Sequence, residues 1–309
     1  NAPTTTSHPS SSTSPNRENT LTANPTAVLA AAPPKKNGYL NSVAASFGQA
    51  TLLMLRQKRI IFATLICFLP VLIPIMMAFV SRNQFSESGL DTFLALATTI
   101  YVYALCPLLA LFFATMLIAQ DVEAHTIPYI LTRPLQRSAW VFGKFLSFIV
   151  TAGAILGIAL ALMFGACTAL SDFPINAENL QLLAHLWVAT LFAMMGYGSL
   201  TMFLGAVSKR PIIIGVILIY AWQPVAMFVP GYIDFFTIRK YISAILPSLA
   251  AKSESQIFST AFGEFEKHFY TVALPQAALS LTVISLAFIL LTVLTVRHRE
   301  YASAHALGG

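Results

Sequence analysis

Charged residues are scarce in this chain. Only 10% of its 309 residues are Asp, Glu, Lys or Arg, whereas a soluble domain carries roughly 25% because water must solvate its surface. Hydrophobic residues make up 57% of the chain, and the mean hydropathy is +0.73. These values exclude a soluble globular protein, and we expect lipid to cover much of the surface.

Cysteines and catalytic motifs are scarce as well. The three cysteines, Cys67, Cys106 and Cys167, all lie inside apolar runs, so we expect neither a disulfide framework nor a metal site. The sequence has no Gly-x-x-x-x-Gly-Lys-Ser/Thr phosphate loop, no Gly-x-Ser-x-Gly and no His-Glu-x-x-His. We therefore expect no cofactor in this chain, no ATP hydrolysis by that route and no intramembrane hydrolase activity.

Long apolar runs dominate what is present. A helix of about 20 apolar residues spans roughly 30 Å of hydrocarbon, and six segments reach about that length: Ile60–Val80, Phe93–Ala119, Ala139–Leu170, Leu182–Val207, Ile212–Val229 and Thr271–Val296. Prolines inside the first two suggest kinks, which neighbouring helices must accommodate. None has an acidic or basic residue near its middle, which argues against an ion-coupled carrier. The fold class is all-α, a polytopic membrane protein with six spans.

The chain's ends differ from these runs. Residues 1–38 are rich in Ser, Thr, Pro and Asn, and we expect a disordered tail. Residues 39–300 form the predicted six-span domain, and 301–309 a short C-terminal tail. An amphipathic surface helix is expected before the first span, with its apolar face formed by Leu40, Val43, Phe47, Ala50 and Met54.

The basic residues predict the orientation. A cytoplasmic N-terminus places most of the 18 Lys and Arg inside and most of the 12 Asp and Glu outside, as the positive-inside rule requires. Both termini are therefore expected in the cytoplasm. The outer segment 230–270 then contains two predicted short amphipathic helices, marked by apolar residues at three- and four-residue spacing: Phe235, Ile238, Ile242, Ile245 and Leu249, then Phe258, Phe262, Phe265 and Phe269.

The inner loop between the second and third spans is the most informative segment. Asp121 and Glu123 end the second span, and a short helix is expected from Thr126 to Leu131. Arg133 precedes a proline and so disfavours helix. A short helix held against the bilayer can receive a push from a soluble partner. The alternative is an ordinary cytoplasmic loop, in which the acids cap helix ends or pair with the arginines.

This loop resembles the signature of the type-2 ABC exporter permeases, the membrane subunits of a group of ATP-binding-cassette transporters. The match departs at His125 and Pro128, where the family often has Gly and Glu. The matching positions are Asp121, Glu123, Thr126, Ile127, Tyr129, Leu131, Thr132, Arg133, Pro134, Arg137, Gly143 and Lys144. The order of surface helix, six spans and long outer segment is also similar.

The resemblance implies a mechanism and a set of partners. Two permease subunits would pair, as a homo- or heterodimer in the cytoplasmic (inner) membrane, and each would dock a separate cytoplasmic ATPase that binds ATP and Mg²⁺. The segment 121–138 would be the coupling helix of an exporter. The implied ATPase contacts are Asp121, Glu123, His125, Tyr129, Arg133 and Arg137, and the structural motif is Thr126, Pro134, Gly143 and Lys144.

Other partners and functions follow more simply. Membrane lipid is an expected partner and nucleic acid is not. A non-transporting scaffold or assembly subunit of a larger membrane complex is the alternative function, because the same spans would serve packing alone. Gly196 and Gly198 in the fourth span are expected to permit close helix packing. The substrate is not identified by the sequence.

Overall fold

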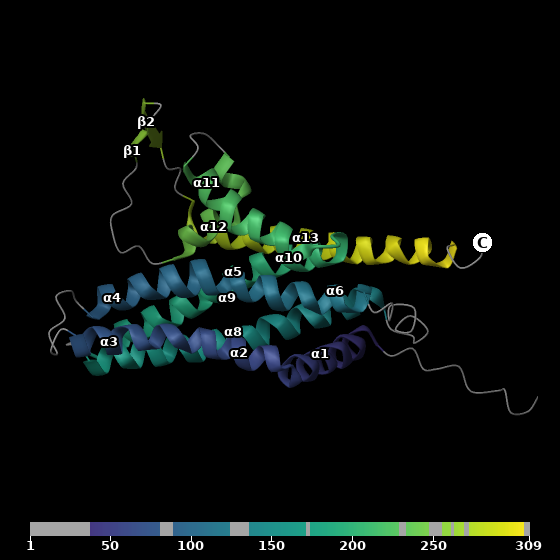
Figure 1. Ribbon diagram of the computed structural model, residues 1–309, viewed down its shortest axis with the longest axis horizontal. Helices are drawn as coiled ribbons and strands as arrows, with labels where there is room; N and C mark the ends of the chain where they lie inside the picture. Colours follow the sequence, from purple (N-terminus) through teal and green to yellow (C-terminus); the bar gives the residue numbers. More distant parts are fainter. Residues whose placement is uncertain are drawn as a thin grey trace, which may run out of the picture. The chain divides into compact units, whose positions relative to one another are not determined.

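A computed structural model shows a helical protein with one short β-hairpin (Figure 1). The structure describes residues 38–80, 89–123, 136–170, 174–228, 233–246, 255–260, 263–268 and 272–305. The predicted disordered tail, apart from its last residue, and most of the predicted coupling loop lie outside these residues.

Five helices are long and apolar enough to cross a membrane. They are Lys58–Val80, Gly89–Gln120, Arg137–Leu170, Ala177–Val207 and Leu274–Arg297, and they confirm spans one, two, three, four and six. The predicted fifth span corresponds to a shorter apolar helix, Pro211–Ala226. Its 16 residues would extend about 24 Å as an α-helix, less than the roughly 30 Å of a hydrocarbon core. The count of six crossings therefore stays a prediction.

Prolines interrupt the regular hydrogen bonding of three of these segments. In span one, Pro70 lies in a 3₁₀ turn, η2 (Leu69–Val71), between α2 (Lys58–Phe68) and α3 (Leu72–Val80). In span two, Pro107 is the second residue of a short helix flanked by π-helical turns. Because proline has no backbone N–H to donate, the carbonyl oxygen one turn before it loses its regular partner. Span two consists of α4 (Gly89–Leu96), η3 (Ala97–Leu105), α5 (Cys106–Leu109), η4 (Ala110–Ala114) and α6 (Thr115–Glu123).

The shorter fifth segment also contains prolines and an irregular helical turn. It consists of α10 (Pro211–Val216), the π-helical η5 (Ile217–Trp222) and α11 (Gln223–Phe228). Pro211 begins α10, a position where proline's fixed backbone suits a helix start, and Pro224 is the second residue of α11, just after η5. Hydrogen bonding is thus irregular at the prolines of spans one and two, where kinks were expected, and the fifth segment adds a further case.

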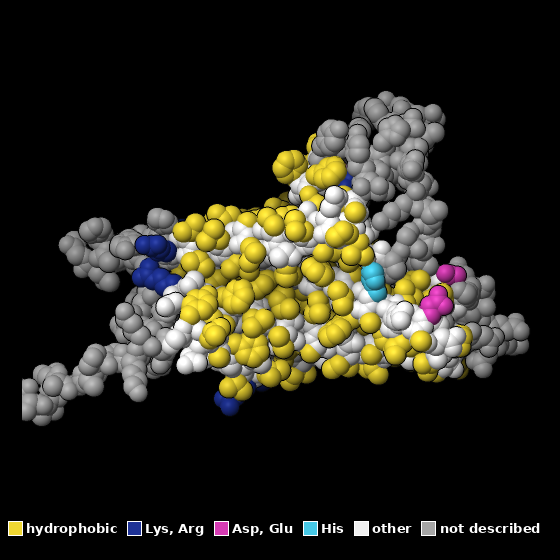
Figure 2. Space-filling model, turned by 180° about the vertical axis from the view of Figure 1, so that it is seen from behind, with side chains coloured by type: hydrophobic (Ala, Val, Ile, Leu, Met, Phe, Trp, Pro, Cys, Tyr) yellow, Lys and Arg dark blue, Asp and Glu magenta, His cyan; other side chains and the backbone are white. Residues whose placement is uncertain are grey.

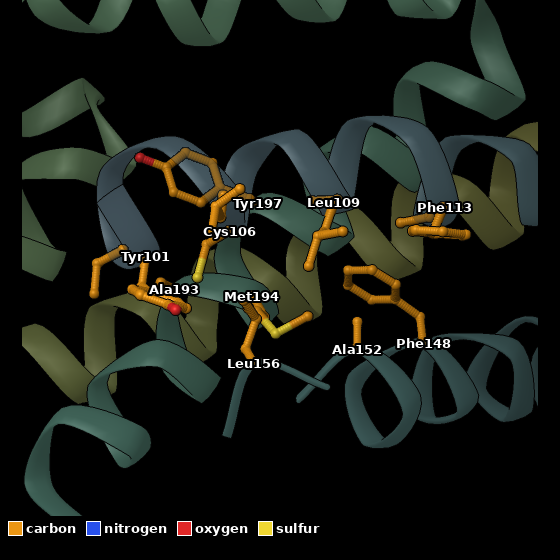
Figure 3. Packing of buried hydrophobic residues seen from close by; sticks show 14 of the residues in the cluster. Tyr101, Cys106, Leu109, Phe113, Phe148, Ala152, Leu156, Ala193, Met194 and Tyr197 are labelled. Atoms are coloured by element: carbon orange, nitrogen blue, oxygen red, sulfur yellow. The ribbon is translucent and has the colours of Figure 1, made fainter. Parts of the chain in front are cut away.

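The hydrophobic core lies between spans two, three and four. Span three is α8 (Arg137–Leu170) and span four is α9 (Ala177–Val207). Tyr101, Phe148 and Leu156 are fully buried, and Figure 3 shows side chains from all three spans meeting there. The Tyr101 hydroxyl donates to the backbone oxygen of Cys67, 3.1 Å away in span one. The last helix, α13 (Leu274–His305), packs mainly on α9 and continues beyond the predicted end of span six.

Glycines allow the close packing of α9. A Cβ atom at Gly198 would lie 2.5 Å from the Phe148 ring, and one at Gly196 would lie 3.0 Å from Ile238. Because neither glycine has a side chain, α8 and the short helix that begins at Ile238 can approach the α9 backbone closely. The predicted packing role of these two glycines is confirmed.

A helix, α1 (Tyr39–Arg56), forms where the surface helix was predicted, and part of the predicted apolar face is buried. Its buried residues are Ser42, Ser46, Ala50 and Met54, so the prediction is confirmed at Ala50 and Met54, whereas Leu40, also predicted on that face, is 79% exposed. The reason is that α1 packs directly on α8, and a close approach of two backbones selects small side chains. The prediction followed hydrophobicity and missed this small-residue stripe.

Of the two helices predicted in the outer segment, one is present and the other is not. Its first part forms a helix, α12 (Ile238–Ile245), preceded by a 3₁₀ turn, η6 (Ile233–Phe236). The second predicted helix is wrong: β1 (Ser255–Thr260) and β2 (Gly263–His268) pair as an antiparallel hairpin, in which Phe258 faces Phe265. Two phenylalanines seven residues apart match two helical turns, and they match cross-strand partners equally well.

Candidate functional site

The predicted coupling loop begins at the end of α6 and finishes at the start of α8. Asp121 and Glu123 lie in the last turn of α6, and Arg137 is the first residue of α8. The remaining implied residues lie outside the described part of the chain: His125, Thr126, Tyr129, Arg133 and Pro134. The structure therefore defines the two helices that carry the loop, together with Gly143 and Lys144 near the start of α8.

Lys144 joins α8 to α6. Only 8% of the residue is exposed, and Nζ donates to the backbone oxygen of Leu117, 2.6 Å away. The ammonium also lies 4.2 Å from the ring centroid of Trp140, within the range of a cation–π interaction. Leu117 lies in the first turn of α6, the helix that ends span two. Lys144 thus links the two helices that flank the loop.

Gly143 brings α1 against α8. A Cβ atom at this position would lie 2.6 Å from Ser46 Cβ and 2.8 Å from the backbone oxygen of Val43, both in α1. Real Cβ contacts are essentially never shorter than 3.0 Å. One turn further along α8, Ser147 Oγ lies 2.9 Å from Thr51 Oγ1, within hydrogen-bond distance. We call this contact between α1 and α8 the α1–α8 seam.

Three helices are therefore fastened together where the loop emerges. The seam joins α1 to α8, and Lys144 joins α8 to α6. The helix before the loop and the helix after it are therefore joined to each other and to α1. Among the described residues, no three His, Cys, Asp or Glu side chains gather as a metal site requires.

Comparison with known families identifies the fold. A family model described as ABC-2 family transporter protein matches residues 52–297, most of the chain. The chain belongs to the ABC-2 transporter family. No curated protein matches it. The matched region begins inside α1 and ends at Arg297 in α13, so it contains all of the apolar segments. The protein is an integral membrane permease of an ABC transporter.

A buried ion pair stabilises the outer segment of this ABC-2 permease. Lys240 Nζ lies 2.6 Å from Asp234 Oδ2, and both side chains are almost completely buried. Thr237, at the start of α12, donates through Oγ1 to the backbone oxygen of Asp234, 2.6 Å away. Burying two charges is favourable only when they are paired and hydrogen-bonded, so these residues hold η6 and α12 in one arrangement.

Beside this pair, a cluster of aromatic and polar side chains connects the outer segment to spans two and four. Arg239 lies 4.5 Å from the ring centroid of Tyr103 in span two. The Tyr197 hydroxyl of α9 donates to Gln223 Oε1 of α11, 3.1 Å away. We call Tyr103, Tyr197, Gln223 and Arg239 the outer cluster. Its members come from four elements, so it is sensitive to their relative position.

Neither the ion pair nor the outer cluster was predicted from the sequence. Asp234, Thr237 and Lys240 recur at three-residue spacing, which indicates one shared helical face but not that the charges are buried. On the same helix, Tyr241 donates to the backbone oxygen of Phe235, 3.0 Å away. Burial raises the pKa of Tyr241, and the negative charge of Asp234 raises it further.

Proposed function

We propose that this chain is the permease subunit of an ABC exporter, driven by a separate cytoplasmic ATPase that docks on residues 121–138. Two such subunits pair in the cytoplasmic membrane, and ATP with Mg²⁺ binds to the ATPase. The docking contacts on this chain are Asp121, Glu123, His125, Tyr129, Arg133 and Arg137.

The fastening of α1, α6 and α8 is the observation that carries this proposal. A loop that transmits force needs both of its ends on elements that move together. Here Lys144 joins the helix before the loop to the helix after it, and Gly143 adds α1 to the same group. A scaffold subunit has no comparable need for rigid loop attachments.

The shorter fifth segment supports six crossings. At its first end, Gly215 lies against Leu111 and Leu204, near the inner ends of spans two and four. At its other end, Tyr220 donates to the backbone oxygen of Ala104, 2.8 Å away. The segment thus runs alongside span two towards the outer side, and η6 and α12 continue from there. A six-crossing path places both termini on one side.

The surface charges support a cytoplasmic position for that side. Figure 2 shows hydrophobic side chains over the middle of one face, with Lys and Arg mostly towards one end and Asp and Glu at the other. Exposed basic residues occur at the start of span one and at the turn before α10: Lys58, Arg59, Lys209 and Arg210. The positive-inside rule assigns this end to the cytoplasm.

Co-purification tests the docking loop. The affinity-tagged chain, extracted in mild detergent, should retain an ABC ATPase identified by mass spectrometry. Exchanging charges with Glu123→Arg and Arg133→Glu together should abolish this association while the protein still inserts in the membrane. The matched control is Lys209→Glu with Arg210→Glu, a charge reversal at the other inner turn, which should leave the association intact. If the ATPase survives the loop reversal, the docking assignment is wrong.

Cysteine labelling tests the topology. Phe236 is exposed in η6, and Lys209 is exposed before α10. A membrane-impermeant maleimide should label Phe236→Cys in intact cells and Lys209→Cys only after permeabilisation. The native Cys67, Cys106 and Cys167 are all buried, so background labelling should be low. Labelling of both positions from the same side would refute a crossing by the fifth segment.

A further inference from the structure

A groove opens between spans one and two in the half of the bundle that carries the predicted coupling loop. Its volume is about 530 Å³, within the roughly 300–1,000 Å³ of ligand pockets. One wall is a face of α2 formed by Phe62, Ala63 and Ile66. The other is a face of span two, with residues at three- and four-residue spacing: Leu105, Leu108, Leu109, Phe112, Phe113 and Met116. We call this the span 1–2 groove.

Its walls are apolar faces that do not close on each other. Phe62 is 66% exposed and Phe112 is 48% exposed, although each belongs to a helix with other apolar neighbours. The packing of α2 is instead directed at α8. The floor is formed by buried residues such as Leu105 and Leu109. The groove therefore offers a long apolar surface to a flexible apolar ligand.

The mouth of the groove is basic. Gln57, Lys58 and Arg59 line one end, at the start of α2, and both basic side chains are exposed. Neither forms an ion pair with another side chain of the described residues. Every other lining residue is apolar. A ligand matched to this site has a negatively charged head beside Lys58 and Arg59 and an apolar tail along Phe62 and Phe112.

We propose that the span 1–2 groove binds an acidic phospholipid from the leaflet in which Lys58 and Arg59 lie. Basic pockets between transmembrane helices attract anionic headgroups, and each Lys or Arg near the surface adds to that attraction. Each buried CH₂ of the acyl chain adds hydrophobic stabilisation. The proposed topology makes this the cytoplasmic leaflet, but binding itself does not depend on that assignment or on the docking of an ATPase.

A second groove supplies a contrast within the same molecule. It lies between α8 and α9, has a volume of about 440 Å³ and is lined by apolar residues with Trp187 at one side. No Lys or Arg lines it. Lipid tails are expected to occupy this groove whatever their headgroup. The α8–α9 groove is therefore an internal control for an apolar groove that lacks a basic mouth.

Native mass spectrometry of the full-length protein in detergent tests the proposal. Dioleoyl phosphatidylglycerol is the acidic probe, dioleoyl phosphatidylcholine has the same chains with a zwitterionic head, and glycerol 3-phosphate is a head without chains. We expect one phosphatidylglycerol to bind in preference to phosphatidylcholine, and no retained glycerol 3-phosphate. Equal binding of both lipids, or retention of glycerol 3-phosphate as strong as that of phosphatidylglycerol, would overturn the proposal.

Two kinds of variant locate the site. Lys58→Gln with Arg59→Gln should weaken phosphatidylglycerol binding about 30-fold and leave phosphatidylcholine binding unchanged. The factor is the loss expected when two basic side chains near the membrane surface no longer attract the headgroup. The matched control is Lys209→Gln with Arg210→Gln, which removes the same charge from the other inner turn and should have little effect. An equal loss in both double variants would mean diffuse attraction to a basic end and would overturn the site.

Filling the groove supplies an independent test. Ala63→Trp on one wall and Leu108→Trp on the other should each prevent lipid binding, whereas Ala161→Trp in the α8–α9 groove should not. Size-exclusion chromatography with light scattering checks that each variant is folded and reports its oligomeric state. If the groove-filling variants retain the lipid, the groove is not a lipid site. The same conclusion follows if the native protein binds no lipid and the variants instead disrupt a dimer.

Discussion

Replacing Gly143 by alanine is expected to push α1 away from α8. The new Cβ atom would lie 2.6 Å from Ser46 Cβ, whereas ordinary contacts begin near 3.4 Å, and the next neighbours are backbone atoms of Val43 and Phe47. Backbone atoms move only when the whole helix moves. Overpacking of this kind costs about 1–3 kcal/mol, while alanine gains about 1 kcal/mol over glycine inside a helix. The net loss of stability should be about 0–2 kcal/mol.

Gly165 provides the matched control. It lies in the same helix, α8, and a Cβ atom there would meet nothing within 4 Å. Gly165→Ala therefore keeps only the helix-forming gain of about 1 kcal/mol. The two alanine variants should differ by about 1–3 kcal/mol, the cost of overpacking alone, even though their chemistry is identical.

A disulfide across the α1–α8 seam reports the displacement directly. Thr51 Oγ1 and Ser147 Oγ are 2.9 Å apart, so Thr51→Cys with Ser147→Cys should form a disulfide under mild oxidation. Adding Gly143→Ala should slow this reaction and lower the thermal unfolding midpoint in detergent, followed by tryptophan fluorescence. Adding Gly165→Ala should do neither. If both alanine variants are equally stable and cross-link equally fast, Gly143 is not what brings α1 and α8 together.

Three further predictions concern other parts of the bundle. Tyr101→Phe removes the hydroxyl that donates to Cys67 and should cost about 0.6–1.7 kcal/mol, seen as a lower unfolding midpoint than that of the wild type. Asp234→Asn leaves the Lys240 charge buried without its partner carboxylate and should cost about 3–5 kcal/mol; Asp234→Leu with Lys240→Met should recover most of that loss, and a double variant no better than the single one would contradict a paired arrangement. The raised pKa of Tyr241 contributes stability while the phenol is protonated, and this contribution is lost as the pH rises past about 10, so Tyr241→Phe should show a smaller alkaline drop in unfolding midpoint.

The spans were predictable because one physical requirement dominates them. A segment that crosses hydrocarbon must be apolar over most of its length. This composition can be recognised in the segment itself, without knowing which other helices it packs against. The coupling role of residues 121–138 rests on a family's residue pattern and stays a prediction, because most of these residues lie outside the described part of the chain. The helices of the fifth segment, from Pro211 to Phe228, agree closely with the predicted Ile212–Val229, but the π-helical turn η5 within them was not predictable from apolar composition.

What the sequence did not reveal depends on partners far along the chain. The buried stripe of α1 is set by Gly143, almost 100 residues after Ser46, so hydrophobicity within α1 alone pointed to Leu40 instead. The hairpin at Phe258 and Phe265 fits two periodicities, and pairing between the two strands chose one. Asp234 and Lys240 looked like ordinary outer charges because nothing local signals their burial.

Span two is the element that joins the two ends of this permease. Its last helix, α6, carries Asp121 and Glu123 and accepts the Lys144 bond. Tyr103, in the middle of the span, lies against Arg239 of the outer cluster and belongs to the first of two π-helical turns on either side of Pro107. These turns interrupt regular hydrogen bonding, and such interruptions are where helices bend. Span two therefore combines, in a single helix, an end joined to α8 and an irregular middle that contacts the outer cluster. If an ATPase docks on residues 121–138 as proposed, this helix is the element through which a displacement of the loop would reach the outer cluster.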